Sequence, residues 1–508
     1  MGEKTRSSYA VKNVSLGYIC TFLTDIFAFV NRTVLVWILG NAYVGVNGLF
    51  TDVLGVLSFA ELGIGTALNF SLYKPVAEYD ENKIKSLMCL YRTAYRTIAF
   101  SIAAIGLGVL PFLRYVVKDP GDIGDIRVYY CVFLFNTVTS YFVSYKYSLV
   151  NARQENYLFS VINMLTKCVS AGTQLIILYA SMNYFWYLMA GAIVELLQKV
   201  WAAWYLNKRY PILCERNCQP LEKSEKEEIW KNVRALIWHK VGDVSVHQTD
   251  NIIVSAFIDI ATVGRVTYYN SFILAANQML SVAMNSVIGS LGNALSCEGT
   301  EKKYELFKTY RFVAFWLYGY ISIGLYLMLS KLVGLLVGPD MFLPNIVIFL
   351  IVLNFYMMGN RIAVNNMKVA GGVFQQDKFV AVLQAGINLV SSILLVRLVG
   401  LPGVYMGTIL QGLLSTVVKP VIVYKAMFNR KATEYFLSGM KYIIAVFMAG
   451  LICLWVDCSY FQAVTQWSFL VEIILISGII NIIFLVLFAK TKEFQYLWKM
   501  MQQVFGRN

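Results

Sequence analysis

Charged side chains are scarce in this sequence. Asp, Glu, Lys and Arg make up 14% of the 508 residues, whereas hydrophobic residues make up 58% and the mean hydropathy is +0.60. Soluble domains carry about 25% charged residues, so this composition excludes an ordinary soluble protein and indicates a membrane protein. The net charge of +14 does not indicate nucleic-acid binding, because the basic residues are scattered among apolar runs.

Enzyme signatures are also missing. The chain contains no Gly-rich nucleotide-binding loop, no HExxH, no DxD and no GxSxG motif. Loops between the apolar runs do not exceed about 25 residues, which leaves no room for a soluble catalytic domain. We therefore expect neither an enzyme nor a cofactor. With no nucleotide site, any energy input would come from a proton or Na+ gradient, the membrane potential or substrate mass action.

Cysteine and histidine do not form a recognisable metal or disulfide framework. Most of the nine cysteines lie within apolar segments, such as Cys20, Cys131 and Cys168, so no disulfide framework is implied. Cys214 and Cys218 are close in sequence, but no second pair of ligands accompanies them, and we expect no metal site. The chain has two histidines, and both lie between residues 230 and 257.

Long apolar runs recur along the chain. We predict about fourteen spans of roughly 20 or more residues, each long enough to cross about 30 Å of hydrocarbon. This length indicates helices, because the strands of a membrane barrel need only about ten alternating residues. The predicted fold class is therefore all-α integral membrane. The predicted spans are 13–40, 44–72, 87–112, 127–150, 158–181, 184–207, 230–257, 262–293, 307–332, 343–369, 378–400, 403–427, 436–457 and 466–490.

The basic residues predict an orientation. With a cytoplasmic N-terminus, about 33 basic residues face the cytosol and about six face outward. This alternation predicts a multi-pass protein of the cell membrane with both termini in the cytosol. No cleavable signal pattern is present, so we expect the first apolar segment to be retained as a span. The tail Lys490–Phe505 is amphipathic, and we expect it to lie on the inner leaflet.

The chain repeats weakly. A shift of about 219 residues places Gly45 on Gly264 and Lys83 on Lys302. Six spans fall within each repeat, so both repeats enter the membrane from the same side and are parallel, with a substrate site expected between them. The predicted organisation is an N-terminal six-helix lobe at 1–218, a C-terminal six-helix lobe at 219–432, and two extra spans with the amphipathic tail at 433–508.

The span at 230–257 is the least hydrophobic and carries a polar stripe. His239, Asp243, His247 and Asp250 fall within one narrow sector of a helix, because their spacing follows its period of about 3.6 residues. Ionisable groups are costly at bilayer depth and usually line a cavity. We predict that these residues, with Asp25 of the first span, bind a coupling proton or Na+, since histidine titrates near neutral pH.

Basic and amide side chains in other spans predict an anionic substrate that carries hydroxyl groups. Arg32, Lys167, Lys240 and Arg361 could neutralise phosphate, and Asn277 could bind sugar hydroxyls. The alternative is that these groups pair locally and hold helices together. The residues that share a polar face of the fifth span are Lys167, Ser170 and Gln174.

Several short motifs lie close together in residues 25–100. They are Asn31-Arg32, Leu39-Gly40, Tyr43-Val44-Gly45, the run from Leu57 to Gly65, and Tyr73-Lys74-Pro75. This opening resembles the polysaccharide biosynthesis and export flippases, the oligosaccharide branch of the multidrug/oligosaccharidyl-lipid/polysaccharide exporter superfamily. The resemblance implies two six-helix lobes in a V, which move undecaprenyl-diphosphate-linked sugar repeat units to the outer leaflet by alternating access. Arg32 is the one binding residue carried over from the family.

The leading hypothesis is therefore a lipid-linked oligosaccharide flippase for capsule, O-antigen of lipopolysaccharide, or exopolysaccharide assembly. An ion-coupled multidrug or metabolite antiporter on the same scaffold is an alternative, although exporters of cationic drugs should favour an acidic cavity. A membrane glycan polymerase is a third hypothesis, and it should show a large outward loop with catalytic Arg or His. The expected partners are the lipid-linked oligosaccharide and the membrane, with a polysaccharide polymerase and glycosyltransferases as further candidates and no nucleic acid.

Overall fold

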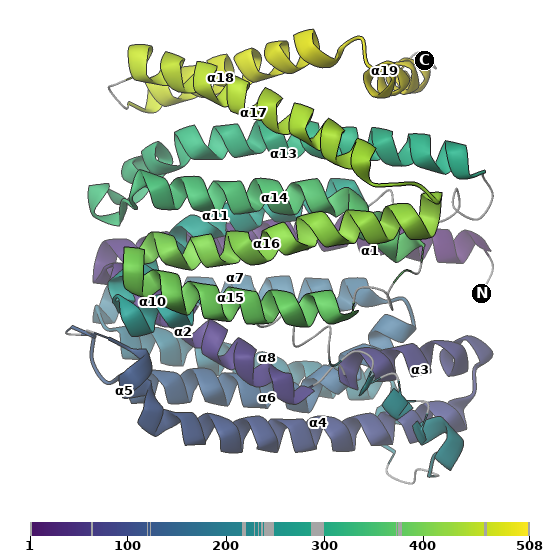
Figure 1. The fold of residues 1–508 in the computed structure, drawn as a ribbon. Helices are drawn as coiled ribbons and strands as arrows, with labels where there is room; N and C mark the ends of the chain where they lie inside the picture. Colours follow the sequence, from purple (N-terminus) through teal and green to yellow (C-terminus); the bar gives the residue numbers. More distant parts are fainter. Residues whose placement is uncertain are drawn as a thin grey trace. The chain divides into compact units, whose positions relative to one another are not determined.

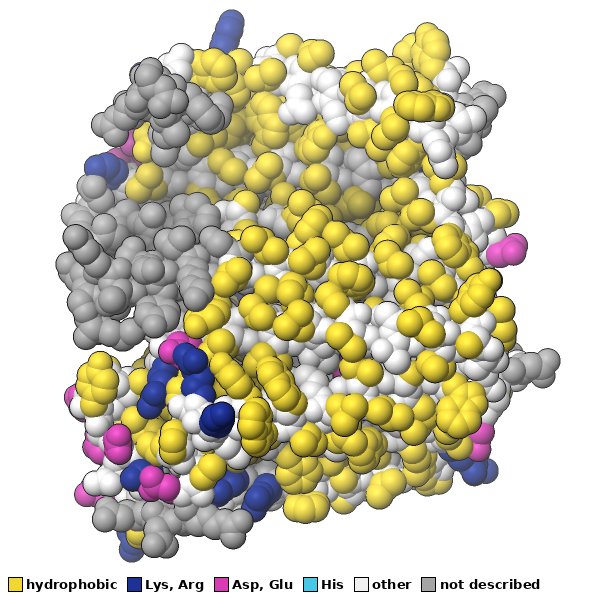
Figure 2. Space-filling view, turned by 180° about the vertical axis from the view of Figure 1, so that it is seen from behind, with side chains coloured by type: hydrophobic (Ala, Val, Ile, Leu, Met, Phe, Trp, Pro, Cys, Tyr) yellow, Lys and Arg dark blue, Asp and Glu magenta, His cyan; other side chains and the backbone are white. Residues whose placement is uncertain are grey.

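The protein is built from membrane-length helices. The computed structural model describes residues 3–61, 64–118, 120–121, 123–215, 220–227, 229–231, 233–234, 237, 248–285, 299–371, 373, 378–461 and 465–505. Every regular element within these ranges is a helix, which confirms the predicted fold class. Among the described residues, ten helices are long and apolar enough to cross a membrane. In Figure 2 hydrophobic side chains cover most of the visible face, while charged side chains gather toward its left and right edges, as expected for a multi-pass membrane protein.

The ten helices account for ten of the predicted spans, and three of the other four are also helical. The sixth and eighth predicted spans are α8 (Tyr184–Arg209) and α11 (Ile260–Asn285), each 26 residues long. The second span is divided between α2 (Asn41–Leu57) and α3 (Ile64–Glu78). Helix α10 (Asp250–Phe257) forms the end of the seventh predicted span.

The chain divides into two compact units, Met1–Thr267 and Tyr268–Asn508. The first unit therefore contains α10 and the first turns of α11 in addition to six N-terminal spans. Within this unit α1 packs on α7, α7 on α8, and α6 on both α4 and α8 (Figure 1). The further helices of this unit are α1 (Glu3–Leu39), α4 (Glu81–Val109), α5 (Leu113–Val116), α6 (Ile126–Ala152) and α7 (Asn156–Ser181).

The second predicted span is not one continuous helix, which corrects the sequence interpretation. Helix α2 ends at Leu57, and a single 3-10 turn, Ser58–Glu61, follows it. The Ser58 hydroxyl donates to the carbonyl of Gly55 at 2.6 Å. This side-chain hydrogen bond satisfies a carbonyl in the last turn of α2, where the helix ends. Two tyrosines of α4 donate hydrogen bonds to polar groups near the break. Tyr91 donates to the carbonyl of Gly65, and Tyr95 donates to Glu61 Oε1 at 3.0 Å. A broken helix at membrane depth requires such internal partners.

The second unit packs its helices in a similar way, with α15 against α16 and α14 against both α13 and α16 (Figure 1). At the α15–α16 crossing a Cβ on Gly407 would lie 2.2 Å from Ser392 Oγ, so the two helices approach closely there. The helices of this unit are the remainder of α11, α13 (Thr300–Val337), α14 (Asn345–Ala370), α15 (Lys378–Val399), α16 (Leu401–Val423), α17 (Thr433–Tyr460), α18 (Gln466–Phe488) and α19 (Lys492–Phe505).

The two additional spans, α17 and α18, attach to α13 through two basic residues, the buried Arg311 and the half-buried Lys331. The Arg311 guanidinium donates to Ser438 Oγ at 2.7 Å and to the Tyr435 carbonyl at 2.8 Å, and it lies 3.6 Å from the centre of the Tyr435 ring. Lys331 forms ion pairs with Asp457 and with Glu472. Because an unpaired charge is costly in this environment, these contacts fix α17 and α18 on α13.

The predicted amphipathic tail is helical as α19, but part of its apolar face contacts the protein. Phe494 and Leu497 pack against the hydrophobic cluster formed by α13, α17 and α18. Trp498 is 51% exposed, so part of its ring can contact lipid or water. The predicted position on the inner leaflet stays a prediction.

Two repeat-equivalent glycines meet where α2 crosses the start of α11, within the first unit. A Cβ on Gly45 would lie 2.0 Å from the carbonyl oxygen of Ile260, and a Cβ on Gly264 would lie 1.9 Å from the carbonyl oxygen of Asn41. Asn41 and Ile260 are related by the same sequence shift as the two glycines, so the contact is reciprocal. Glycine is required at both positions because the two backbones touch.

We predict that Gly264→Ala destabilises the protein by about 1–3 kcal/mol, because the new methyl group must displace backbone atoms. Gly172→Ala on α7 is the matched control, since its added Cβ meets nothing within 4 Å and alanine favours helix. The midpoint of thermal unfolding of the purified protein in detergent measures both changes. Equal midpoints for the two variants would show that the crossing tolerates a side chain.

Candidate functional site

Two adjoining cavities lie inside the first unit. The first has a volume of about 280 Å³ and is lined by α1, α2, α6, α7 and α8. The second has a volume of about 380 Å³ and is lined by α6, α7 and α8. Both lie near the lower end of the usual range for ligand sites, about 300–1,000 Å³. Three residues line both cavities and mark their junction: Asn136, Lys167 and Glu195.

Helix α1 contributes Asn31 and Arg32 to the first cavity. The Asn31 amide donates to Gln174 Oε1 at 2.8 Å, and Gln174 in turn donates to the Tyr187 carbonyl at 3.4 Å. Gly191 allows this arrangement, because a Cβ there would lie 2.4 Å from the Gln174 amide nitrogen. The amide chain fixes α1 against α7 and α8 beside Arg32.

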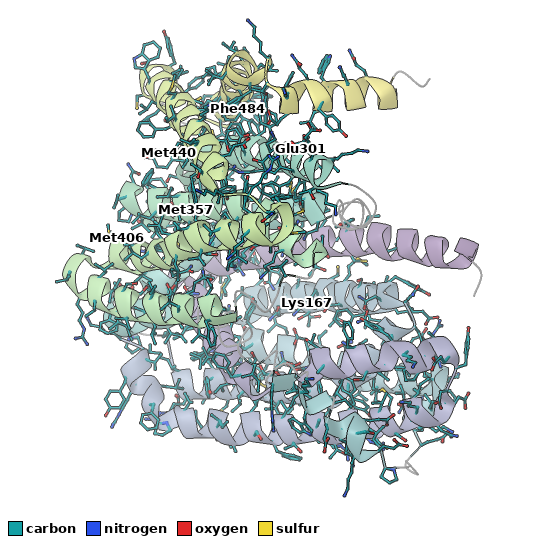
Figure 3. All side chains as sticks on the ribbon, turned by 45° about the vertical axis from the view of Figure 1, so that its right-hand side comes forward. Lys167, Glu301, Met357, Met406, Met440 and Phe484 are labelled. Carbon is teal, nitrogen blue, oxygen red and sulfur yellow. The ribbon has the colours of Figure 1, made fainter. Side chains whose placement is uncertain are left out.

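An ionic network occupies the junction of the cavities. Lys167 Nζ lies 2.7 Å from Glu195 Oε1, and the Asn136 amide donates to the other oxygen of this carboxylate. Lys199 donates to the Asn136 carbonyl at 2.7 Å and to Thr139 Oγ1 at 3.0 Å. The network joins α6, α7 and α8, and Figure 3 labels Lys167 on α7. The charged groups of a membrane bundle are retained at such depth when they pair and face a cavity.

The charge balance of the two cavities is positive. Their charged lining residues are Arg32, Lys167, Lys199 and Glu195. Three basic groups against one acid favour anions, and guanidinium and ammonium groups are the usual partners of phosphate. Lys167 is 45% exposed and Glu195 is 20% exposed, so their pair stays accessible from the cavity.

The structure brings together two of the predicted substrate-binding residues, Arg32 and Lys167, on one cavity. The predicted polar face of the fifth span is also found there, because Ser170 and Gln174 line the same cavity. Asp25 lies on α1, half-buried, and is not among the residues that line either cavity.

The predicted residues of the second unit make helix contacts. Arg361 donates to the carbonyls of Met357 at 3.2 Å and Gly412 at 3.3 Å, which places its guanidinium at the crossing of α14 and α16. Asn277 Oδ1 accepts a hydrogen bond from Tyr318 of α13 at 3.2 Å. Neither residue lines the two cavities of the first unit, and their predicted roles in substrate binding stay predictions.

Most of the predicted ion-coupling stripe lies outside the described residues, namely His239, Asp243 and His247, as does Lys240 of the predicted substrate site. Asp250 is described and begins α10. Its neighbour Asn251 donates to the carboxylate of Asp52 on α2, which lies near Asp250. Two carboxyl groups of α2 and α10 therefore lie close together, and Asp52 was not singled out from the sequence.

Sequence reasoning also missed Glu195, Lys199 and Asn136. The sequence did contain a signal for Glu195 and Lys199. Together with Gln198 they share one face of a helix within an otherwise apolar run. The acid and the lysine of α8 lie four residues apart and could have been interpreted as a local pair. The structure shows instead that Glu195 pairs with Lys167 of α7. The partner could not be assigned from spacing within one helix.

Solved structures similar to this chain are membrane transporters. A lipid II flippase, MurJ, in an inward closed conformation has a TM-score of 0.69 at 13% identity, over 93% of this chain and 99% of that one. An inward-facing multidrug resistance MATE transporter of the MOP superfamily has a TM-score of 0.61 at 13% identity, over 78% and 92% of the two chains. The Vibrio cholerae MATE transporter VcmN has a TM-score of 0.55 at 14% identity, over 84% and 99%.

Neither protein-family models nor curated protein sequences gave a match to this chain. The structural similarity nevertheless extends over nearly the whole length of the transporters. At these identities the similarity concerns the fold. The chain is a multi-pass membrane protein with the transporter fold that the lipid II flippase MurJ and the MATE exporters of the MOP superfamily share.

Proposed function

We propose that this protein is a flippase that moves undecaprenyl-diphosphate-linked oligosaccharide repeat units from the cytoplasmic to the outer leaflet for polysaccharide assembly. The observation that carries the proposal is the excess of basic groups, Arg32, Lys167 and Lys199, around polar cavities inside a membrane bundle. A diphosphate headgroup must shed water to cross the bilayer, and paired cationic groups in a cavity replace that hydration.

The proposed transport cycle is alternating access, in which the cavities of the first unit open first to one side of the membrane and then to the other. Arg32 and Lys167 bind the diphosphate, and the lipid tail remains in the bilayer. The coupling proton or Na+ binds to Asp25 and to the polar stripe of His239, Asp243, His247 and Asp250. Asp52, beside Asn251, adds a carboxyl group to this ion site.

The MATE exporters share the fold, so a multidrug antiporter is the competing function. The charge of the cavities separates the two proposals. A cationic drug would be repelled by cavities that together carry three basic residues and one acid, whereas a diphosphate would be attracted to them.

Deletion of the gene in its natural host tests the proposal. We predict that lipid-linked repeat units accumulate on the cytoplasmic face of the cell membrane, because their synthesis continues while their translocation stops. Everted and right-side-out membrane vesicles, probed with a glycan-binding lectin, report the leaflet. Accumulation on the outer face would contradict a flippase, and normal export with increased drug sensitivity would favour the antiporter.

Removal of a cavity cation should weaken binding of the diphosphate. We predict that Arg32→Ala and Lys167→Met each lower the affinity of the purified protein in nanodiscs for undecaprenyl diphosphate by about 10- to 100-fold, since a hydrogen bond to a charged group contributes roughly 1.5–3 kcal/mol. Arg114→Ala is the matched control, because Arg114 lies on α5 and donates to the exposed Tyr115 hydroxyl. Unchanged affinity in both cavity variants would return Arg32 and Lys167 to a role in helix packing.

Neutralisation of the ion site should uncouple transport rather than abolish substrate binding. We predict that Asp250→Asn stops export and removes its dependence on a proton or Na+ gradient in proteoliposomes, while undecaprenyl diphosphate still binds. Asp125→Asn serves as the control, because Asp125 caps α6 and asparagine caps equally well. Gradient-driven export by Asp250→Asn at the wild-type rate would exclude Asp250 from coupling.

A further inference from the structure

The second cavity has a chemistry that phosphate binding does not explain. Hydroxyl and amide groups dominate its lining, with two aromatic rings, Tyr147 and Phe159, that meet edge to face at 4.8 Å. A phosphate site needs donors, whereas this lining offers acceptors as well. The polar residues that line it besides the junction are Thr137, Ser140, Ser144, Asn163, Thr166, Gln198 and Lys199.

The hydrogen bonds of the hydroxyl groups show which atoms remain for a ligand. Ser140 donates to the Thr137 carbonyl at 2.6 Å, Ser144 donates to the Ser140 carbonyl at 2.8 Å, and Thr166 donates to the Ile162 carbonyl at 2.7 Å. Each hydroxyl proton is thus directed to its own helix, and the oxygen keeps lone pairs that can accept. The Ser140, Ser144 and Thr166 hydroxyl oxygens can therefore act as acceptors on the cavity wall.

Donors lie on the same wall. The Gln198 amide donates to the Tyr147 hydroxyl oxygen at 3.3 Å, so the phenolic proton of Tyr147 and the carbonyl oxygen of Gln198 are left for other partners. Lys167 at the junction adds a cationic donor. A group that both donates and accepts, such as a sugar hydroxyl, matches this mixture, and the Tyr147 and Phe159 rings can cover the apolar face of a sugar ring.

We propose that the second cavity binds the saccharide of the lipid-linked substrate while the first cavity binds its diphosphate. This inference rests on the proposed flippase function. The two cavities share Asn136, Lys167 and Glu195, so one ligand can pass from the phosphate groups of the first cavity to the sugar groups of the second. Tyr147 lies near the end of α6 and Phe159 near the start of α7, on the side that the basic residues predict to be cytoplasmic, where the substrate is loaded.

Filling the second cavity provides the test. Ser140→Leu/Ser144→Leu places two larger side chains one helical turn apart on its wall. The matched control is Thr93→Leu/Thr97→Leu, because these exposed threonines of α4 also lie one turn apart and also donate to carbonyls of their own helix. Gln198→Ala is a milder second variant that keeps the cavity open. Size-exclusion chromatography establishes that each variant is folded.

Two probes are titrated against each protein in nanodiscs: sugar-free undecaprenyl diphosphate, and the host's own lipid-linked repeat unit purified from the deletion strain. We expect the filled variant to bind the sugar-free lipid within twofold of wild type and the repeat unit at least tenfold more weakly. We expect Gln198→Ala to weaken repeat-unit binding about threefold or more, and the control to match wild type with both probes.

The outcomes separate the inference from the proposed function. Repeat-unit affinity within twofold of wild type in the filled variant and in Gln198→Ala would overturn the saccharide site. An equal loss for both probes would also overturn it, by assigning the second cavity to the diphosphate. Failure of the wild-type protein to bind sugar-free undecaprenyl diphosphate would instead overturn the proposed function on which the inference rests.

Discussion

The cost of placing charge at membrane depth governs this structure. Lys167 and Glu195 belong to helices that cross the bilayer, where an isolated ion is strongly destabilising. Their 2.7 Å pair, with Asn136 bound to the carboxylate and to Lys199, satisfies each charge with a partner on another helix. Removing one member of such a pair typically costs about 3–5 kcal/mol, because it strands the other. The network therefore holds α6, α7 and α8 together and at the same time supplies the charge of the cavity.

Close helix approach is the second requirement, and glycine provides it where a side chain could not fit. The reciprocal contact of Gly45 and Gly264 lets α2 and α11 cross backbone to backbone, and Gly191 opens space for Gln174 beside the first cavity. Apolar burial alone does not favour helix association in lipid, since the surrounding tails are equally apolar. Small residues and polar partners must therefore determine which helices meet, and Gly191 with the Asn31–Gln174 hydrogen bond does so beside the first cavity.

The sequence predicted the fold better than the site, for a physical reason. Span length and charge alternation depend on the thickness of the bilayer and need no knowledge of neighbours, so the all-helical fold and most spans could be predicted. The break after Leu57 could not, because its stability depends on tyrosines of α4 some 30 residues later. Lys167 and Gln174 were found because one helix face carries them both. Glu195 was missed, because its role as an ion-pair partner depends on Lys167, which lies on the other helix of the α7–α8 crossing.

The two repeats share helix order, yet their equivalent crossings differ in charge. The α7–α8 crossing of the first unit holds the Lys167–Glu195 pair. The α15–α16 crossing of the second unit holds a neutral pair, in which the Gln384 amide donates to Gln411 Oε1 at 2.6 Å. Both pairs satisfy polar groups inside a bundle, but a neutral amide pair exerts little force on a distant phosphate. The two crossings therefore meet the same requirement for internal polar partners in different ways, with a charged pair in the first unit and a neutral amide pair in the second.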